Sequence, residues 1–278
     1  MTKILMRSYL SSIISLIFVV ISFKMNLISE FTLIREGNVR HSLGFSHPNF
    51  LAGILLLIFM ETLFIFYKSR KQNIQIIILT LVVIIVLNNV TGSRTSTLTA
   101  ILSWLIFFLY INIPKLFLNK KIIYVLSFSV LLGFIVSYLF AKNYDNYKPF
   151  MFSLNKLTSG RLRMANQFLL ENKVNFFGNE LDVLTTEKAI NSGYLQTKIL
   201  DNAYVSILLK YGLINVILFN VLYILSMIKM IKLNMIKEVL LILIFVIFGF
   251  FESYFTYFQF NFTILFWGLL FQGGKRNV

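Results

Sequence analysis

"AYVSILLKYGLINVILFNVLYILSMI", residues Ala203–Ile228, is an apolar run whose only charge is Lys210. A helix needs roughly 17 to 25 residues to cross a hydrocarbon core of about 30 Å, and this run is long enough. The rest of the chain agrees with it, because 58% of the residues are hydrophobic and only 13% are charged. The sequence therefore predicts an integral membrane protein.

Seven further apolar segments predict transmembrane helices of the same kind. They lie near residues 9–28, 50–67, 74–90, 95–113, 122–140, 239–253 and 259–271, with Glu252 near the turn between the last two. The expected fold class is an all-α polytopic membrane protein with about eight spans. We expect residues 1–278 to form a single integral membrane domain, with one long extracytoplasmic loop over residues 141–202.

The distribution of lysine and arginine predicts the orientation, because short cytoplasmic loops retain these residues. The alternate short loops hold only Arg35, Arg40 and Arg94, so we expect them to face outward together with the long loop. Both termini are then cytoplasmic. The opposite ends of the spans carry the larger set: Lys3, Arg7, Lys68, Arg70, Lys71, Lys115, Lys120, Lys121, Lys229, Lys232, Lys237, Lys275 and Arg276.

Several kinds of site are not indicated. The chain has no cysteine, which excludes disulfide and thiolate chemistry. Its net charge of +15 follows from the loop distribution and does not indicate nucleic acid. His41 and His47 have no third ligand nearby in the sequence, and no outer loop carries two acids at DxD spacing. We therefore expect neither a metal nor another cofactor.

Polar motifs occur where spans are expected to begin at the outer face. Helix N-termini carry exposed N–H groups and a partial positive charge, so they favour anions. Arg40, Arg94 and Arg161 belong to this side, and an arginine fork matches phosphate oxygens. For each arginine alone, a position among lipid headgroups explains it equally well. The motifs are "SHPN" (46–49), "TGSRTS" (91–96), "DNAY" (201–204) and the region of Asn261.

Asp201 is the candidate general base, because it lies where the long loop returns to the membrane and a carboxylate there can accept a proton from a hydroxyl group. Aspartate is also a preferred N-cap, so capping of the following helix explains it as well. Lys210 lies about 13 Å further along that helix at 1.5 Å per residue. Within the loop, "TSGRLRMANQFLLE" (158–171) predicts a surface helix with Leu162, Ala165 and Leu169 on one face behind a Ser or Thr cap.

Four motifs in a fixed order carry a family resemblance over residues 40–271. The chain resembles the O-antigen ligase and polymerase superfamily, and more narrowly the capsular or exopolysaccharide repeat-unit polymerases, although a single expected span precedes the first motif. The motifs are "RHSLGFSHPNFLAG" (40–53), "TGSRTSTLTA" (91–100), "SGRLRMANQFL" with "FFGNEL" (159–169 and 176–181) and "DNAYVSILLKYGLINVILF" (201–219).

The resemblance implies a GT-C-like bundle acting as an inverting, metal-independent glycosyltransferase. The expected substrate is an undecaprenyl-diphosphate-linked oligosaccharide, added to a growing glycan at the outer face of the bacterial plasma membrane. Further expected partners are membrane lipid, a flippase and a chain-length regulator. An O-antigen-type ligase, a lipid-linked glycan flippase and a non-catalytic assembly scaffold are the alternatives.

The resemblance also implies roles for individual residues. Arg94 and Arg161 are expected to hold the diphosphate. Asp201-Asn202 stands where the ligases carry His-Asn, and the histidine is their proposed base. Asp201 is therefore the expected base here, and the difference favours a polymerase over a ligase. The expected substrate contacts are Arg40, His47, Asn49, Arg94, Arg161, Asn202, Tyr204 and Lys210.

Overall fold

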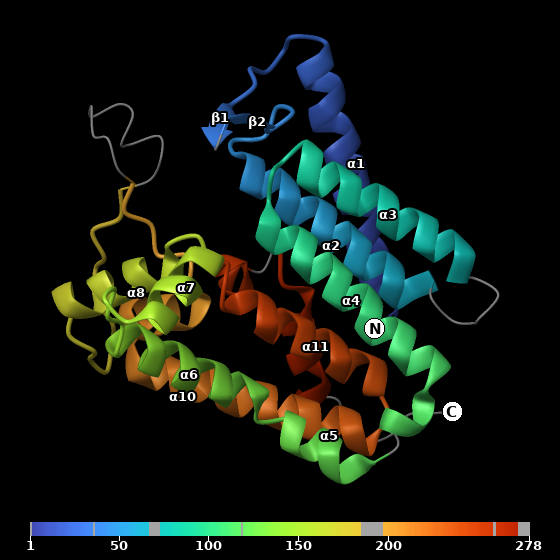
Figure 1. Ribbon diagram of the computed structural model, residues 1–278. Helices are drawn as coiled ribbons and strands as arrows, with labels where there is room; N and C mark the ends of the chain where they lie inside the picture. The colour runs from blue at the N-terminus through green and yellow to red at the C-terminus, as the bar shows by residue number, and fades with distance from the viewer. Residues whose placement is uncertain are drawn as a thin grey trace. The chain divides into compact units, whose positions relative to one another are not determined.

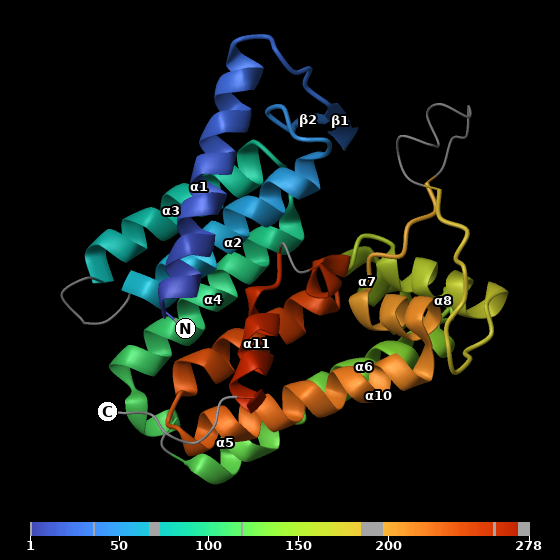
Figure 2. The same ribbon diagram turned by 180° about the vertical axis from the view of Figure 1, so that it is seen from behind.

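The computed structural model describes residues 2–35, 37–66, 73–117, 119–184, 197–257 and 260–271 (Figure 1, and from behind in Figure 2). These residues are predominantly α-helical, which confirms the helical class, and they include one short two-stranded sheet. Among them, four helices are long and apolar enough to cross a membrane, by length and composition: Leu5–Lys24, Pro48–Phe66, Arg94–Asn112 and Ala203–Lys232.

All eight predicted apolar segments contain helix, but the helices of the other four have 17 residues or fewer. These four segments correspond to α3 (Asn73–Asn89), the pair α5 (Lys120–Leu126) and α6 (Ser129–Lys142), α11 (Ile236–Gly249) and the 3₁₀ helix η4 (Phe262–Phe271). The expected single helix over 122–140 is divided by a turn at Ser127, whose N–H donates to the Tyr124 carbonyl at 3.2 Å. Of the residues that set the predicted orientation, Lys68, Arg70, Lys71, Lys275 and Arg276 lie outside the described residues.

The contacts divide the chain into two compact units, where the sequence predicts one domain. The first comprises residues 1–122, 235–244 and 259–262. Its central helix, α2 (Pro48–Phe66), packs against α1 (Thr2–Lys24), α3 and α4 (Arg94–Asn112). Most side chains of α2 are buried, because neighbours cover it on several sides. Pro48 begins α2, as expected from its fixed φ angle at the first helical turn.

A β-hairpin in the first unit was not predicted. Strands β1 (Thr32–Arg35) and β2 (Asn38–His41) pair antiparallel, with Leu33 opposite Arg40. The hairpin is fixed to the following helices, because the His41 N–H donates to the Val90 carbonyl at 2.8 Å. This bond holds the end of β2, and therefore Arg40, next to the start of α4.

The second unit comprises residues 123–234, 245–258 and 263–278. Helix α6 runs alongside α10 (Ala203–Lys232), as both Figure 1 and Figure 2 show. The long loop contains α7 (Pro149–Leu157), which was not predicted, and α8 (Arg161–Glu171), which was. Helix α8 buries Leu162, Ala165 and Phe168 against α6 and the start of α10, so the loop shares a core with the helices. The N-cap of α8 is Gly160, which makes no side-chain cap, so the expected Ser or Thr cap is wrong.

Helix α10 is broken at Gly212, where the backbone has φ 83° and ψ 175°. The segment that follows α8 supplies the hydrogen bonds missing at the break. The Leu213 N–H donates to the Asn175 carbonyl at 2.9 Å, and the Asn179 N–H donates to the Leu209 carbonyl at 2.8 Å. The apolar run that predicts one continuous helix thus forms two helical segments, because an inserted loop satisfies the backbone groups freed by a glycine.

We predict that Gly212→Ala destabilises the protein more than Gly160→Ala. Gly160 (φ 84°, ψ −2°) has the left-handed α conformation, which costs a residue with a side chain about 1–2 kcal/mol, and Gly212 (φ 83°, ψ 175°) has a conformation essentially restricted to glycine, which costs about 1–3 kcal/mol. A Cβ atom at Gly212 would lie 2.4 Å from the Phe176 carbonyl oxygen, whereas nothing lies within 4 Å at Gly160. Thermal unfolding of the purified variants in detergent measures the difference. Equal decreases in Tm would contradict the close packing at the break.

Candidate functional site

Three ionised side chains of the second unit form a charge cluster, defined here as Arg161, Asp201 and Glu252. Arg161 donates from Nε to Asp201 Oδ2 at 3.2 Å and from Nη2 to Glu252 Oε1 at 2.6 Å. The side chains of Arg161 and Glu252 are only 12% and 3% exposed, whereas that of Asp201 is 29% exposed. Asp201 is therefore the member of the cluster most open to a ligand.

Each residue of the charge cluster comes from a different part of the chain. Arg161 is the first residue of α8, and Asp201 lies two residues before α10 begins. Glu252 precedes the 3₁₀ helix η3 (Ser253–Thr256), in the turn that follows α11. The sequence singles out Arg161 and Asp201 but offers no signal for Glu252 beyond an acid in an apolar stretch.

The electrostatics of the cluster keep the arginine charged. Burial alone would lower the pKa of Arg161, but the carboxylates of Glu252 and Asp201 outweigh burial and raise the pKa above its ordinary value. Burial first, and then the charges of Glu252 and Asp201, also raise the pKa of Tyr254. The Tyr254 phenol therefore stays protonated beside the cluster. With both carboxylates ionised, the cluster carries one net negative charge.

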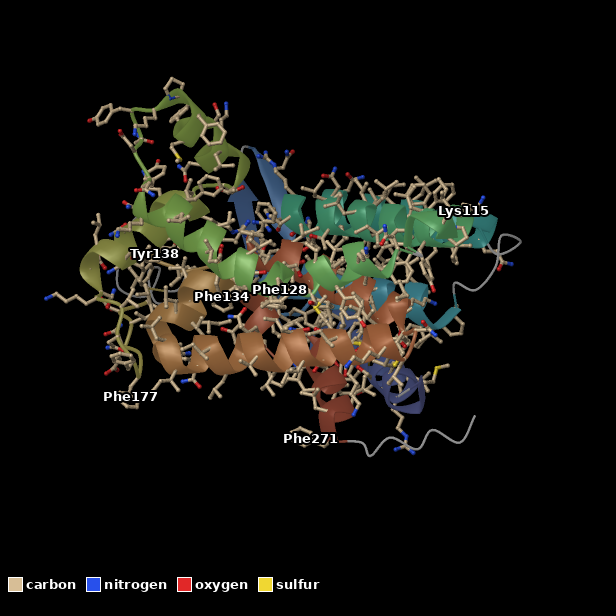
Figure 3. The ribbon with its side chains drawn as sticks, turned by 90° about the horizontal axis from the view of Figure 1, so that it is seen from below. Lys115, Phe128, Phe134, Tyr138, Phe177 and Phe271 are labelled. Atoms are coloured by element: carbon tan, nitrogen blue, oxygen red, sulfur yellow. The ribbon has the colours of Figure 1, made fainter. Side chains whose placement is uncertain are left out.

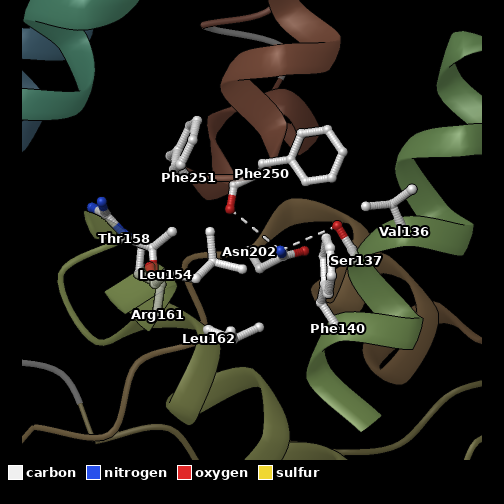
Figure 4. Close-up of a pocket in the computed structure, with 10 residues that line it drawn as sticks. All are labelled: Val136, Ser137, Phe140, Leu154, Thr158, Arg161, Leu162, Asn202, Phe250 and Phe251. Carbon is white, nitrogen blue, oxygen red and sulfur yellow. Dashed lines mark hydrogen bonds between the residues drawn. The ribbon is translucent and has the colours of Figure 1, made fainter. Parts of the chain in front are cut away.

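A cavity of about 130 Å³ lies beside Arg161 (Figure 4). Its walls are mainly apolar, and Arg161, Asn202, Ser137 and Thr158 add polar atoms. The apolar lining residues come from α6, α7, α8 and the end of α11: Val136, Phe140, Leu154, Leu162, Phe250 and Phe251. An apolar cavity next to a buried cation suits a ligand with an apolar chain and an anionic group.

Asn202 and Tyr204 hold the start of α10 in place. The Asn202 amide oxygen accepts the Val205 N–H at 3.0 Å, so Asn202 caps α10 and the expected cap at Asp201 is wrong. The Asn202 amide nitrogen donates to Ser137 Oγ and to the Phe250 carbonyl, both at 3.3 Å (Figure 4). Tyr204 is fully buried and donates to the Val246 carbonyl at 2.6 Å. Substrate contact by these two residues stays a prediction.

Arg40 and Arg94 line a second pocket, which lies in the first unit. Its volume is about 380 Å³, and Asn38, Asn88 and Asn89 contribute side-chain amides to it. Arg94 is exposed and begins α4, where the Ser93 hydroxyl accepts the Ser96 N–H as N-cap. Two arginines, amide groups and a helix N-terminus favour an anion.

Arg40 is held rigidly in this pocket. Its Nε donates to the Thr91 carbonyl at 2.6 Å, and its Nη2 donates to Asn49 Oδ1 at 2.5 Å. The position also depends on Gly92, because a Cβ atom there would lie 3.0 Å from Arg40 Cγ. The sequence predicts Arg40, Asn49 and Arg94 as substrate contacts, and the fold brings Arg40 together with each of the other two.

The remaining predicted contacts have local partners. His47 Nδ1 accepts the Asn49 N–H at 3.0 Å, which makes His47 part of the start of α2 and requires an unprotonated Nδ1. Lys210 is exposed, and its Nζ lies 5.3 Å from the centre of the Tyr211 ring. Glu30 Oε1 accepts the Leu43 N–H and lies 3.2 Å from His41 Nδ1, which joins the end of β2 to the segment before β1.

Comparison of the chain with known proteins assigns it to no family. No family model matches the chain, and neither a curated protein nor a solved structure matches it. Within the described part of the chain, no three histidine, aspartate or glutamate residues come together as a metal site would require. The charge cluster, the apolar cavity and the arginine pocket are therefore the features of the chain that bear on its function.

We predict that Arg161→Met destabilises the protein far more than Arg163→Met. Arg163 is exposed on the same helix, so its loss changes stability by about 0.5 kcal/mol or less. Loss of Arg161 leaves Glu252 buried without its cation, and breaking a buried pair costs about 3–5 kcal/mol. Thermal unfolding in detergent measures both variants. The double variant Arg161→Met with Glu252→Gln should recover part of the loss, and a cost equal to that of Arg163→Met would show that the cluster is not a structural pair.

Proposed function

We propose that the protein is a polysaccharide polymerase that transfers undecaprenyl-diphosphate-linked oligosaccharide repeats onto a growing glycan. The observation that carries the proposal is Arg161, which pairs with two carboxylates and also lines an apolar cavity. An amphipathic anion, such as a polyprenyl diphosphate, needs both an apolar surface and a nearby cation. The order of the four sequence motifs supports the same assignment.

The arginine pocket supports an anionic substrate through a separate set of residues. Arg40 is fixed by Thr91 and Asn49, so it offers a preorganised positive charge beside the N-terminus of α4. Preorganised charge often provides the largest part of catalytic stabilisation, because it needs no rearrangement when charge develops on the leaving group. In our proposal Arg94 and Arg40 bind a diphosphate group of a lipid-linked substrate.

The proposed reaction is a single displacement. Asp201 accepts the proton of an acceptor hydroxyl, and the hydroxyl oxygen forms a bond to the anomeric carbon of the donor glycan as the bond from that carbon to the diphosphate oxygen breaks. Undecaprenyl diphosphate leaves with the bonding electrons, and attack from the opposite side inverts the anomeric configuration. Asp201 suits the base role because it is the most exposed member of the charge cluster.

In our proposal Arg161 acts chiefly as a positioning residue. Two of its three nitrogens donate to Glu252 and Asp201, and among the described residues Nη1 has no hydrogen-bond partner. Nη1 is then the donor that remains for a phosphate oxygen. Glu252 holds the guanidinium from the buried side, and Arg161 in turn fixes the Asp201 carboxylate through Oδ2.

The proposal includes the finer membrane architecture. It requires about eight spans in a GT-C-like bundle in the bacterial plasma membrane, both termini in the cytoplasm and residues 141–202 outside. Substrate, flippase and chain-length regulator would then meet the protein at its outer face. The four helices of spanning length and the lysine-rich short loops support this arrangement.

We predict that a cysteine placed at Arg163 is accessible from outside the cell, whereas one at Lys115 is not. The natural chain has no cysteine, so each single variant gives an unambiguous signal with a membrane-impermeant maleimide. Both positions are exposed on the protein, so burial does not explain a difference between them. Arg163→Cys should react in intact cells, and Lys115→Cys only after permeabilisation. Labelling of Lys115→Cys in intact cells would show that the proposed orientation is inverted.

We predict that Asp201→Ala and Arg94→Ala each abolish long glycan chains while membrane insertion stays intact. Loss of the base removes proton transfer, and loss of one charge-stabilising donor lowers the rate on the order of 100-fold or more. The measurement is a gel of lipid-linked and polymeric glycan from cells that carry each variant as the sole copy of the gene. Arg163→Ala is the matched control and should give full-length polymer.

The same gel separates the alternatives. Loss of a polymerase leaves single repeats outside the membrane, loss of a flippase leaves them inside, and loss of a scaffold lowers the amount of polymer only in part. An O-antigen-type ligase differs in its acceptor, so its loss leaves long lipid-linked chains that reach no final acceptor. Full-length polymer from Asp201→Ala cells would show that Asp201 is not the base.

A further inference from the structure

Two adjacent phenylalanines of the second unit are strongly exposed. Phe176 is 65% exposed and Phe177 is 84% exposed, and Phe177 lies at the outer edge of the unit (Figure 3). We call these two residues the aromatic tip. In water the exposure of two phenylalanine rings is unfavourable, because each ring keeps a large apolar area in contact with solvent. The function proposed above does not use these residues.

The exposure of the aromatic tip is built into the fold. The Asn175 amide nitrogen donates to the Gly178 carbonyl at 2.9 Å and to Asn179 Oδ1 at 2.8 Å, which closes the loop around the tip. Gly178 lies against the backbone of α10, since a Cβ atom there would come 2.1 Å from the Lys210 carbonyl oxygen. The Ile214 N–H donates to the Phe176 carbonyl at 3.2 Å. The tip is therefore held at a fixed position, directly at the break in α10.

The aromatic tip continues an apolar stripe on α10. After Gly212, the exposed apolar side chains recur at helical spacing, as on one face of a helix. This helix is long and apolar enough to cross a membrane, so a stripe of exposed apolar residues on it is the surface that lipid chains would cover. The residues of the stripe are Ile214, Ile217, Leu218, Val221 and Leu225.

The length of α10 sets where the stripe meets the membrane surface. At 1.5 Å per residue, Leu213–Lys232 is about 30 Å long, which equals the thickness of a typical hydrocarbon core. Lys229 and Lys232 lie in the last turn of the helix. If they mark one headgroup layer, the opposite layer falls at Gly212 and the aromatic tip.

Basic and aromatic residues surround the break in α10 and the aromatic tip. Lys173 and Lys210 are exposed, Lys210 lies over the Tyr211 ring, and the Asn179 amide binds the Lys173 carbonyl at 2.9 Å. Aromatic rings concentrate at the interface between membrane and water, and lysines near helix ends extend to the headgroups. The charge of Lys210 suits phosphate groups of lipids at this level, which agrees with its exposure.

We propose that the aromatic tip inserts into the lipid bilayer at the headgroup boundary and anchors the break of α10 at the membrane surface. The segment Ala203–Tyr211 then stands above that surface, and it sets the height of Asp201 and Arg161. The inference rests on the proposed membrane location of α10. It adds a lipid-binding surface that positions the charge cluster relative to the bilayer.

The test uses the full chain with single cysteines that carry an environment-sensitive NBD label. Phe177→Cys reports on the aromatic tip, Val221→Cys on the stripe of α10 and Arg163→Cys on the exposed face of α8. Each labelled protein is reconstituted into vesicles of phosphatidylcholine and phosphatidylglycerol, with either ordinary or dibrominated acyl chains. We expect brominated lipid to quench most of the emission at positions 177 and 221 and to leave position 163 unchanged. A single symmetric peak in gel filtration confirms that each variant is folded.

The outcomes separate the two proposals. Quenching at position 221 but not at 177 would refute the lipid contact of the tip and leave the span intact. Absence of quenching at both positions would refute the membrane location as well. A label at 177 that is shielded from both brominated lipid and aqueous iodide is covered by protein, such as a second copy of the chain, and this result would also overturn the proposal.

Discussion

The pairing of Arg161 with Glu252 and Asp201 is the interaction on which the second unit depends. It joins the start of α8, the approach to α10 and the turn after α11, and the arginine is separated from Glu252 by 91 positions in the sequence. A buried guanidinium is tolerated only with paired carboxylates, because desolvation of an unpaired charge costs several kcal/mol. These three segments therefore have to come together for the unit to fold, and the apolar cavity beside Arg161 forms as a result.

The features that depend on nearby residues were predictable from the sequence. The apolar runs locate all eight helical segments, Pro48 marks the start of α2 and Ser93 precedes α4. The buried face of α8 follows from helical spacing, and Leu169 packs against the same core, partly buried, next to the fully buried Phe168. In each case a few adjacent positions contain the information. Arg40 and Arg94 line one pocket, whereas their predicted position at the outer face stays a prediction.

The features that depend on distant partners were not predictable. Glu252 pairs with Arg161, which lies 91 positions away, and nothing near Glu252 in the sequence indicates that contact. The break at Gly212 likewise needs the backbone of Phe176 and Gly178, which fills the position that a side chain would take. The N-cap of α10 also depends on a distant contact. Asp201 and Asn202 are both good N-caps, and the choice of Asn202 follows from the contact between Asp201 and Arg161.

The two candidate sites have opposite electrostatic character, which fits two different tasks. The arginine pocket joins two cations and several asparagines at a helix N-terminus, a combination that favours an anion. The charge cluster joins one cation to two carboxylates, of which Asp201 is the more exposed, and in the proposed reaction this carboxylate accepts the proton. Glu252 pairs with the Arg161 guanidinium from the buried side at 2.6 Å, and the same guanidinium contacts the more exposed Asp201 at 3.2 Å. Arg161 is thus fixed by one carboxylate while it orients the other, which is the carboxylate that the proposed reaction uses.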